Sequence, residues 1–205
     1  MKNLLLVVSL AFAGMVGCTS EPPKPAEKPQ PRGPELVTGR TAFQKLYIAA
    51  RGWARDAQPY RLQSEITSDA SGKDGKAALW QASFASPSQR GVKPYVWSGS
   101  DRENAPSHGV SPGNEDNYNP TNSTTQIFDI QFLKVDSDKA FEEAQKHGGD
   151  KLLEKSPDAP VFYILDWSPS TSKLIWHVIY GSNRDEAKLR VAIDATSGEF
   201  IRVEK

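Results

Sequence analysis

Three apolar runs follow one another near the end of the chain: Val161-Phe-Tyr-Ile-Leu-Asp-Trp167, Leu174-Ile-Trp-His-Val-Ile-Tyr180 and Leu189-Arg-Val-Ala-Ile-Asp-Ala-Thr-Ser-Gly-Glu-Phe-Ile-Arg-Val203. In the third run, apolar and other residues alternate from Leu189 to Asp194. A period of two is typical of a strand with one buried face and one wet face. The stretch from Val161 to Val203 therefore predicts three or four successive strands.

A helix is predicted just before these strands. Asp136 or Ser137 is the expected N-cap, and the helix carries apolar residues on one side and ends with a basic turn and a glycine, namely Ala140, Phe141, Ala144, Lys146, His147 and Gly148. Basic residues in the last turn and a glycine beyond it are typical of a helix C-terminus. A further strand, Ile127–Leu133, is predicted ahead of this helix.

The first half of the chain repeats this plan more weakly. Thr41 and Gln44 have the spacing of a capping box, and an amphipathic helix is predicted from there to about Asp56. Strands are predicted at Tyr60–Ile66, Trp80–Phe84 and Val92–Trp97. Thr41-Ala-Phe aligns with Lys139-Ala-Phe, which favours an internal duplication, although chance can also produce so short a match.

The predicted fold class is α+β, with two related units, each a helix packed on a three- to four-stranded antiparallel sheet. The first unit spans 40–125 and includes a long loop, 98–125. The second spans 126–205.

The second unit resembles the PepSY and PepSY-like domains of exported bacterial proteins. The resemblance lies in the helix with Ala140 and Ala144 and in a strand that runs into Asp194-Ala-Thr-Ser-Gly198 and out again at Phe200. Asp and Gly in that loop suit a short hairpin. The resemblance implies a binding or inhibitory module without catalytic residues, and the first unit matches less well because it lacks this turn.

Residues 1–17 have the layout of a secretory signal peptide. Met15-Val16-Gly17-Cys18 resembles the lipobox of bacterial lipoproteins, with Met15 where leucine is usual. The resemblance implies that Cys18 is lipidated and holds the chain at a membrane, and Thr19 after it favours the outer membrane, facing the periplasm. In a Gram-positive source the anchor would lie on the outer leaflet of the cell membrane. The alternative is an ordinary signal peptide with an incidental cysteine.

Residues 18–39 form a proline-rich linker behind the anchor. The segment is almost free of apolar residues, so it favours an extended, semi-rigid stalk. A proline-rich docking motif is the alternative interpretation.

The long loop, 98–125, is either a mobile connector or a binding loop. Its cluster Asn114-Glu-Asp-Asn117 is oxygen-rich but lacks the spacing of a dedicated calcium loop, so no metal is predicted. The candidate binding residues are two tryptophans at strand ends and two residues of the loop: Trp97, His108, Tyr118 and Trp167.

No catalytic residue, cofactor or nucleic-acid partner is predicted. The formal net charge is +0 and opposite charges are interspersed, so the charge pattern does not predict binding to a nucleic acid or another polyanion. His177 is expected to be an exposed or half-covered sheet residue. The favoured function is a lipid-anchored, non-enzymatic module that binds an envelope protein or peptide, with a peptidase-inhibitory or regulatory role as one form of that function. The alternatives are a hydrolase using His108 or His177 with loop carboxylates, and a passive structural lipoprotein.

Overall fold

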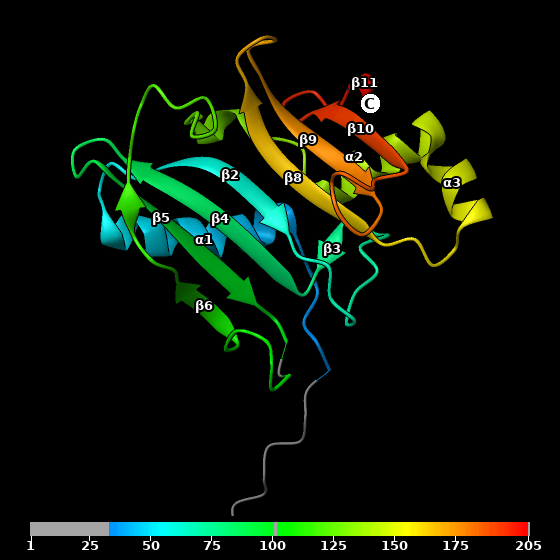
Figure 1. Cartoon of the computed structure of the whole chain (residues 1–205), viewed down its shortest axis with the longest axis horizontal. Helices are drawn as coiled ribbons and strands as arrows, with labels where there is room; N and C mark the ends of the chain where they lie inside the picture. Colours follow the sequence, from blue (N-terminus) through cyan, green and yellow to red (C-terminus); the bar gives the residue numbers. More distant parts are fainter. Residues whose placement is uncertain (1–32, 101, 205) are drawn as a thin grey trace, which may run out of the picture. The chain divides into compact units, whose positions relative to one another are not determined.

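The computed structural model describes residues 33–100 and 102–204, which form a mixed α/β fold dominated by one antiparallel sheet (Figure 1). The predicted signal peptide, Cys18 and the linker up to residue 32 lie outside the described residues. None of the described helices is long and apolar enough to cross a bilayer.

The large sheet has nine strands, in the order β11-β10-β9-β8-β2-β4-β5-β6, with β7 also paired to β5. In chain order they are β2 (Gln58–Ser64), β4 (Leu79–Ser86), β5 (Gly91–Ser98), β6 (Gly109–Pro112), β7 (Asp116–Asn117), β8 (Val161–Ser168), β9 (Lys173–Tyr180), β10 (Leu189–Asp194) and β11 (Phe200–Glu204). The strand predictions for 60–66, 80–84, 92–97, 161–167 and 174–180 and for the closing hairpin are confirmed within a few residues.

The two halves of the chain share this sheet. Strand β2 pairs antiparallel with β8, and Leu62 lies opposite Leu165. Strands β8 and β9 are apolar on both faces along most of their length, as strands at the centre of a sheet require. One continuous sheet therefore replaces the two separate sheets that the sequence predicted.

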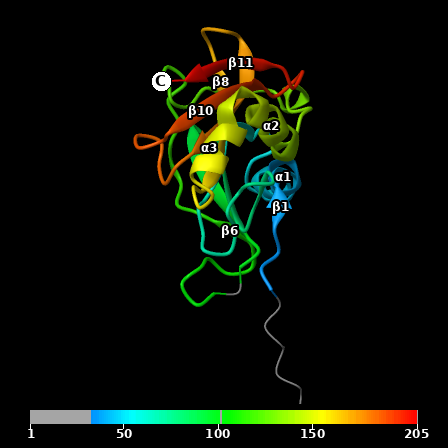
Figure 2. The same cartoon turned by 90° about the vertical axis from the view of Figure 1, so that its right-hand side faces the viewer.

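The helices cover one side of the sheet. Helix α1 (Gly39–Trp53) packs on β2, β4 and β5, and α2 (Ser137–Ala144) packs on β9 and β10. Figure 2 shows α1 and α2 on one side and the connection between β9 and β10 on the other. The core between helices and sheet is built from large buried side chains of both halves, including Trp80, Phe84, Trp97, Tyr163, Trp176 and Tyr180.

The helix starts differ from the capping-box prediction. Helix α1 begins at Gly39, two residues before Thr41, and its N-terminal amides are capped from the other half of the chain. Asp136 Oδ1 accepts hydrogen bonds from Arg40 N at 2.8 Å and from Ser137 N at 2.7 Å. Asp136 is thus the predicted N-cap of α2 and also caps α1, so one carboxylate satisfies both helix ends.

The second helix ends at a glycine, as predicted. Helix α2 gives way to the turn Gln145–Gly149, in which His147 leaves helical dihedral angles and Gly148 has φ 108°, a conformation that favours glycine. The chain then continues as α3 (Asp150–Lys155). A Cβ on Gly149 would lie 2.2 Å from Tyr180 Oη, so glycine lets the turn approach the sheet. Leu152 and Leu153 of α3 pack against the edge of the core.

The strand predicted at Ile127–Leu133 is wrong. This segment is irregular and contains the 3-10 helix η1 (Ile130–Phe132). Phe128 N donates to Pro59 O at 2.9 Å, and the Asp129 carboxylate accepts from Gln131 N at 2.9 Å. These bonds, one to the distant Pro59 carbonyl and one to the neighbouring Asp129 side chain, use amides that a strand would have offered to its neighbour.

The long segment 98–125 is less irregular than expected. Its strands β6 and β7 both pair with β5 at one edge of the sheet. Pro112 ends β6, the last strand in the sheet order, and proline is tolerated on an edge strand although it has no N–H to donate. The segment therefore extends the sheet at one edge through β6 and β7, and its two interpretations, a mobile connector or a binding loop, stay predictions.

The end of the predicted linker is part of the fold. Val37–Thr38 form β1, which pairs with β3 (Lys76–Ala77), and Glu35 N donates to Gly99 O at 2.8 Å. Val37 is 9% exposed and joins the core, so the packed part of the chain begins before the predicted boundary at residue 40.

The predicted hairpin loop between β10 and β11 is confirmed. The Asp194 carboxylate accepts from Thr196 N at 2.8 Å, Gly198 N donates to Asp194 O at 2.8 Å, and Gly198 has φ 81°. Asp at the start and Gly at the end thus serve the roles that the sequence assigned to them.

Candidate binding face

The side of the sheet opposite α1 and α2 is called here the outer face. Because side chains alternate along a strand, cross-strand register identifies which residues share it. Gln63, Ile164, His177, Ala192 and Arg202 follow one another across β2, β8, β9, β10 and β11 on this face. The two halves of the chain therefore contribute to one surface.

A line of alternating charges, the charge row, crosses the outer face. It consists of Arg61, Asp166, His177, Glu204 and Arg202. Arg61 Nη2 lies 3.1 Å from Asp166 Oδ2, and Asp166 Oδ1 lies 3.1 Å from His177 Nε2. His177 Nδ1 lies 2.7 Å from Glu204 Oε2, and Glu204 Oε1 lies 2.8 Å from Arg202 Nη2. The row ties the C-terminal strand to the centre of the sheet.

His177 is 5% exposed, so the prediction of an exposed or half-covered residue is wrong. Burial by itself would lower the pKa of His177, but the hydrogen bonds and charges of Asp166 and Glu204 outweigh it and raise the pKa. Both ring nitrogens are engaged by carboxylates. The arrangement therefore stabilises an imidazolium held in place, with neither nitrogen left to accept a proton from a nucleophile.

The two carboxylates are stabilised in their charged form. Burial would raise the pKa of Asp166, but hydrogen bonds and charge from His177 and then Arg61 lower it. The pKa of Glu204 is also lowered. Burial would raise it, but the hydrogen bond and charge of His177, followed by the charges of Arg202 and Arg184, outweigh burial. Ala192, on β10 between His177 and Arg202, is small enough to let the His177–Glu204 bond cross that strand.

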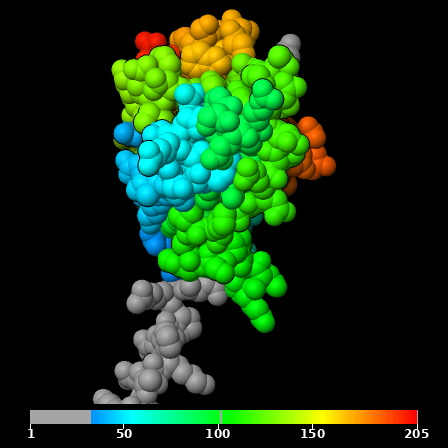
Figure 3. Space-filling model, turned by 90° about the vertical axis from the view of Figure 1, so that its left-hand side faces the viewer, coloured from blue at the N-terminus to red at the C-terminus, as the bar shows by residue number. Residues whose placement is uncertain are grey.

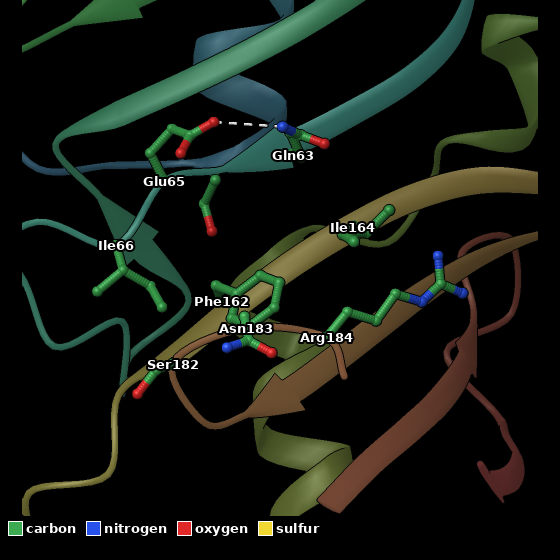
Figure 4. Close-up of a pocket in the computed structure, with 9 residues that line it drawn as sticks. Gln63, Glu65, Ile66, Phe162, Ile164, Ser182, Asn183 and Arg184 are labelled. Atoms are coloured by element: carbon green, nitrogen blue, oxygen red, sulfur yellow. Dashed lines mark hydrogen bonds between the residues drawn. The ribbon is translucent and has the colours of Figure 1, made fainter. Parts of the chain in front are cut away.

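A hollow of about 220 Å³ adjoins the charge row where β2 meets β8. Its apolar walls are Ile66, Phe162 and Ile164, and its polar rim includes Gln63, Glu65 and Arg184 (Figure 4). Gln63 Nε2 donates to Glu65 Oε1 at 3.2 Å, which holds these two side chains together. Ile164 lies opposite His177 in the sheet, so the hollow and the charge row are neighbours.

Arg184 reaches this hollow from the connection between β9 and β10. Figure 3 shows part of this connection, in orange at the right, standing out from the surface on the side opposite α1. Arg184 is exposed, and its charge contributes to the lowered pKa of Glu204. Within the described residues it forms no ion pair at 4.0 Å or less.

Two of the four predicted binding residues, Trp97 and His108, lie near each other, because Glu35 contacts both His108 and Lys45, whereas Tyr118 lies at the other end of β5. Trp97 is 1% exposed and lies under Lys45, whose Nζ is 5.0 Å from the ring centroid. His108 is exposed, with Nε2 3.7 Å from Glu35 Oε2. Trp167 is half-buried against Phe132, with ring centroids 5.4 Å apart. Their roles in binding stay predictions, and Trp97 has almost no surface to offer in this conformation.

Tyr118 lines a separate cavity of about 540 Å³ with Pro87, Arg90 and Ile127. In the oxygen-rich cluster Asn114–Asn117, Glu115 Oε2 accepts a hydrogen bond from Trp53 Nε1 at 3.0 Å and lies 3.8 Å from Lys93 Nζ. Residues 33–100 and 102–204 contain no group of three or more His, Cys, Asp or Glu side chains able to hold a metal ion. The oxygen-rich cluster thus has partners within the protein.

Sequence reasoning missed Asp166, Glu204 and Arg184. Asp166 was detectable in part, because the alternation places Asp166 and His177 on the same side of neighbouring strands. Glu204 lies 27 positions from His177 and reaches it across a third strand, a relationship that depends on the sheet order. Arg184 stands in a charged turn that carries no periodic pattern.

No family model matches the chain, and no curated protein matches it. A similar solved structure is that of a putative lipoprotein (CD1622) from Clostridium difficile 630. The similarity covers 80% of this chain and 91% of that chain, with a TM-score of 0.52 and 12% sequence identity. At this identity the comparison establishes the fold alone: this chain shares its mixed α/β architecture with that protein.

Proposed function

We propose that this protein is a lipid-anchored, non-enzymatic binding module of the bacterial cell envelope that holds an envelope protein or peptide on its outer face. The observation that carries the proposal is the hollow beside the charge row, at the junction of β2 and β8. A small apolar hollow with a polar rim is typical of a recognition site. The charge row supports it by fixing the strands that form its walls.

The proposal includes two PepSY-like units related by duplication. An offset of 98 positions relates Thr38 to Asp136 and Gly39 to Ser137, and the same offset aligns Thr41-Ala-Phe with Lys139-Ala-Phe. Trp80 Nε1 donates to Val37 O and Trp176 Nε1 donates to Val135 O, each at 2.9 Å. Equivalent tryptophans bonded just ahead of equivalent helices support a common origin of the halves.

The non-enzymatic character is supported by His177. In a hydrolase the histidine would leave one ring nitrogen facing a nucleophile. Here each nitrogen faces a carboxylate at 2.7 Å or 3.1 Å, and the raised pKa of His177 favours the protonated ring, which is a poor base. A passive structural role remains the alternative that binding experiments separate from this proposal.

Anchoring at the outer membrane, facing the periplasm, is supported by Met15-Val16-Gly17-Cys18 and by Thr19. The similar Clostridium difficile protein is described as a putative lipoprotein. Replacing Cys18 with serine is expected to abolish acylation and to release the protein from membrane fractions, and retention of that variant in the membrane would contradict the anchor.

The binding function is tested by photo-crosslinking in the native cell envelope. Single probes are placed at Ile66, which is 39% exposed beside the hollow, and at Asn183, in the connection that carries Arg184. The matched control is Ile48, which is 73% exposed on α1. A discrete product at Ile66 and Asn183 but not at Ile48 is expected. Equal products at all positions, or none, would contradict binding on the outer face.

A further inference from the structure

We propose, resting on the function above, that the bound partner is an extended polypeptide segment in which a bulky apolar residue stands next to acidic residues. The apolar residue fills the outer-face hollow, and Arg184 pairs with the acidic side chain. The partner is thus assigned to a chemical class, an acidic peptide with an apolar anchor residue, and Arg184 is the residue that recognises its acidic side chain.

The size of the hollow indicates a single anchor side chain. Its volume of about 220 Å³ lies below the roughly 300–1,000 Å³ of small-molecule sites. Ile66, Phe162 and Ile164 form its walls, and a leucine or phenylalanine side chain placed between them would be partly removed from water. A polypeptide supplies such a side chain together with neighbours that can reach the rim.

The charges around the hollow favour an acidic neighbour. The carboxylates of Asp166 and Glu204 are already paired within the charge row. Of the residues that line the hollow, Arg184 is the one cation and Glu65 is the one carboxylate, and Glu65 accepts a hydrogen bond from Gln63. The guanidinium of Arg184 thus offers the rim a positive charge that is complementary to a negatively charged segment.

Arg184 is the cation best placed to meet such a segment. Arg61 and Arg202 are committed to carboxylates at 3.1 Å and 2.8 Å, whereas Arg184 is exposed on the rim of the hollow. Glu65, on the other side of the rim, is held by Gln63. A guanidinium recognises a carboxylate through paired, directional hydrogen bonds, so Arg184 can set the preference for acidic residues.

A peptide-display selection against the full chain in detergent micelles tests this proposal. The wild-type chain is expected to enrich peptides with Asp or Glu within two positions of a bulky apolar residue. Arg184→Glu is expected to reverse the preference toward Lys and Arg, and Arg55→Glu, at an exposed arginine in the turn after α1, is the matched control that keeps the wild-type preference. Ile66→Ser should remove the enrichment of the apolar residue.

An enriched acidic peptide should then bind Arg184→Glu about tenfold more weakly than it binds the wild-type chain. The same peptide with Asn and Gln in place of Asp and Glu should bind the two proteins with nearly equal affinity. Peptides enriched without acidic bias, or a bias that Arg184→Glu leaves unchanged, would overturn the role of Arg184 and leave the binding function standing. Failure to enrich any peptide while Ile66 and Asn183 still crosslink would show that a folded surface is recognised instead. Failure of both measurements would reject the binding function itself.

Discussion

Trp80 and Trp176 meet edge to face inside the core, with ring centroids 6.4 Å apart and ring planes inclined at 74°. Trp80 comes from the first half of the chain and Trp176 from the second, and both are fully buried. A Cβ on Gly39, the first residue of α1, would lie 2.6 Å from Trp176 Cη2. The side chain of one half therefore packs directly against the helix of the other.

This contact predicts a single unfolding transition. Trp80→Ala or Trp176→Ala should lower the free energy of unfolding by about 3–5 kcal/mol, because each removes a large buried ring and leaves a cavity. Urea titrations followed by fluorescence and by far-ultraviolet circular dichroism should give coincident curves for each variant. Trp167→Ala, at a half-buried site, is the control and should cost less. Two separate transitions, one of them unaffected by the substitution, would show that the halves have independent cores.

Removal of the shared cap should destabilise both helices. Besides the amides of Arg40 and Ser137, the Asp136 carboxylate accepts from Thr38 Oγ1 at 2.7 Å. An N-cap contributes about 0.5–2 kcal/mol, so Asp136→Ala should cost about 2 kcal/mol or more in urea unfolding. Hydrogen exchange should rise in the first turns of both α1 and α2. Asp150→Ala, whose side chain bonds only to the next amide among the described residues, is the control, and an effect confined to α2 would contradict the double cap.

Sequence patterns predicted the local parts of this fold well. Apart from the strand at 127–133, the predicted strands, the hairpin loop at Asp194 and the N-cap of α2 depend on neighbours in the chain, and they are present. The missed features depend on distant contacts: Asp136 reaches Arg40 across 96 positions, and β2 pairs with β8 only because the two halves meet. The false strand at 127–133 has the right composition, but the Asp129 side chain binds the Gln131 amide locally and the distant Pro59 carbonyl binds the Phe128 amide.

The candidate site was less predictable than the fold. His177 was placed on the correct side of its strand, opposite the Leu174, Trp176, Val178 and Tyr180 row, yet its burial requires Glu204 from the far side of β10. Trp97 stood at a strand end beside a polar segment, and its near-complete burial follows from α1 and Lys45 covering it. Surface exposure is a tertiary property, and an aromatic residue at a strand end can be buried by a helix that starts far away in the sequence.

The charge row predicts a definite dependence of stability on pH. Folding raises the pKa of His177, so its contribution is complete below the ordinary histidine value of about 6.5 and is lost as pH rises through the folded-state value. Folding lowers the pKa of Asp166 and Glu204, so their contribution is present above the ordinary carboxyl values of about 4 and is lost as pH falls through the folded-state values. The row should stabilise most between about pH 4 and 6.5.

His177→Gln isolates the histidine contribution. The difference in free energy of unfolding between the wild-type chain and this variant should shrink as pH rises above 6.5, because the imidazolium of the wild-type chain is then lost. Urea titrations at several pH values from 5.5 to 9, on the order of one unit apart, measure this difference. A difference that stays constant across that range would show that folding does not raise the pKa of His177.

The hydroxyl of Tyr163 is expected to stabilise the connection that leads into β3. Its hydroxyl donates to Gly72 O and accepts from Gly75 N at 3.1 Å, and both contacts are buried. Tyr163→Phe leaves that amide without its partner, at a cost of about 1–3 kcal/mol, and the Gly75 amide should exchange faster with deuterium. Tyr180→Phe makes the same chemical change at a hydroxyl that bonds to Gln145 instead. Equal exchange at Gly75 in both variants would contradict the specific role of Tyr163.

Ala192 should control whether the C-terminal strand is coupled to His177. Its side chain lies on the outer face, opposite His177 on one side and Arg202 on the other, and it is fully buried. A leucine there would occupy the space through which the 2.7 Å bond from His177 to Glu204 passes, and overpacking of this kind costs about 1–3 kcal/mol. Once Glu204 is displaced, burial opposes the charged ring with one carboxylate fewer, so the pKa of His177 in Ala192→Leu should fall, as an NMR titration of the imidazole would show. Ala192→Ser changes the volume little and should keep the raised pKa. If the leucine variant titrates like the serine variant, the bond from His177 to Glu204 does not depend on a small residue at position 192.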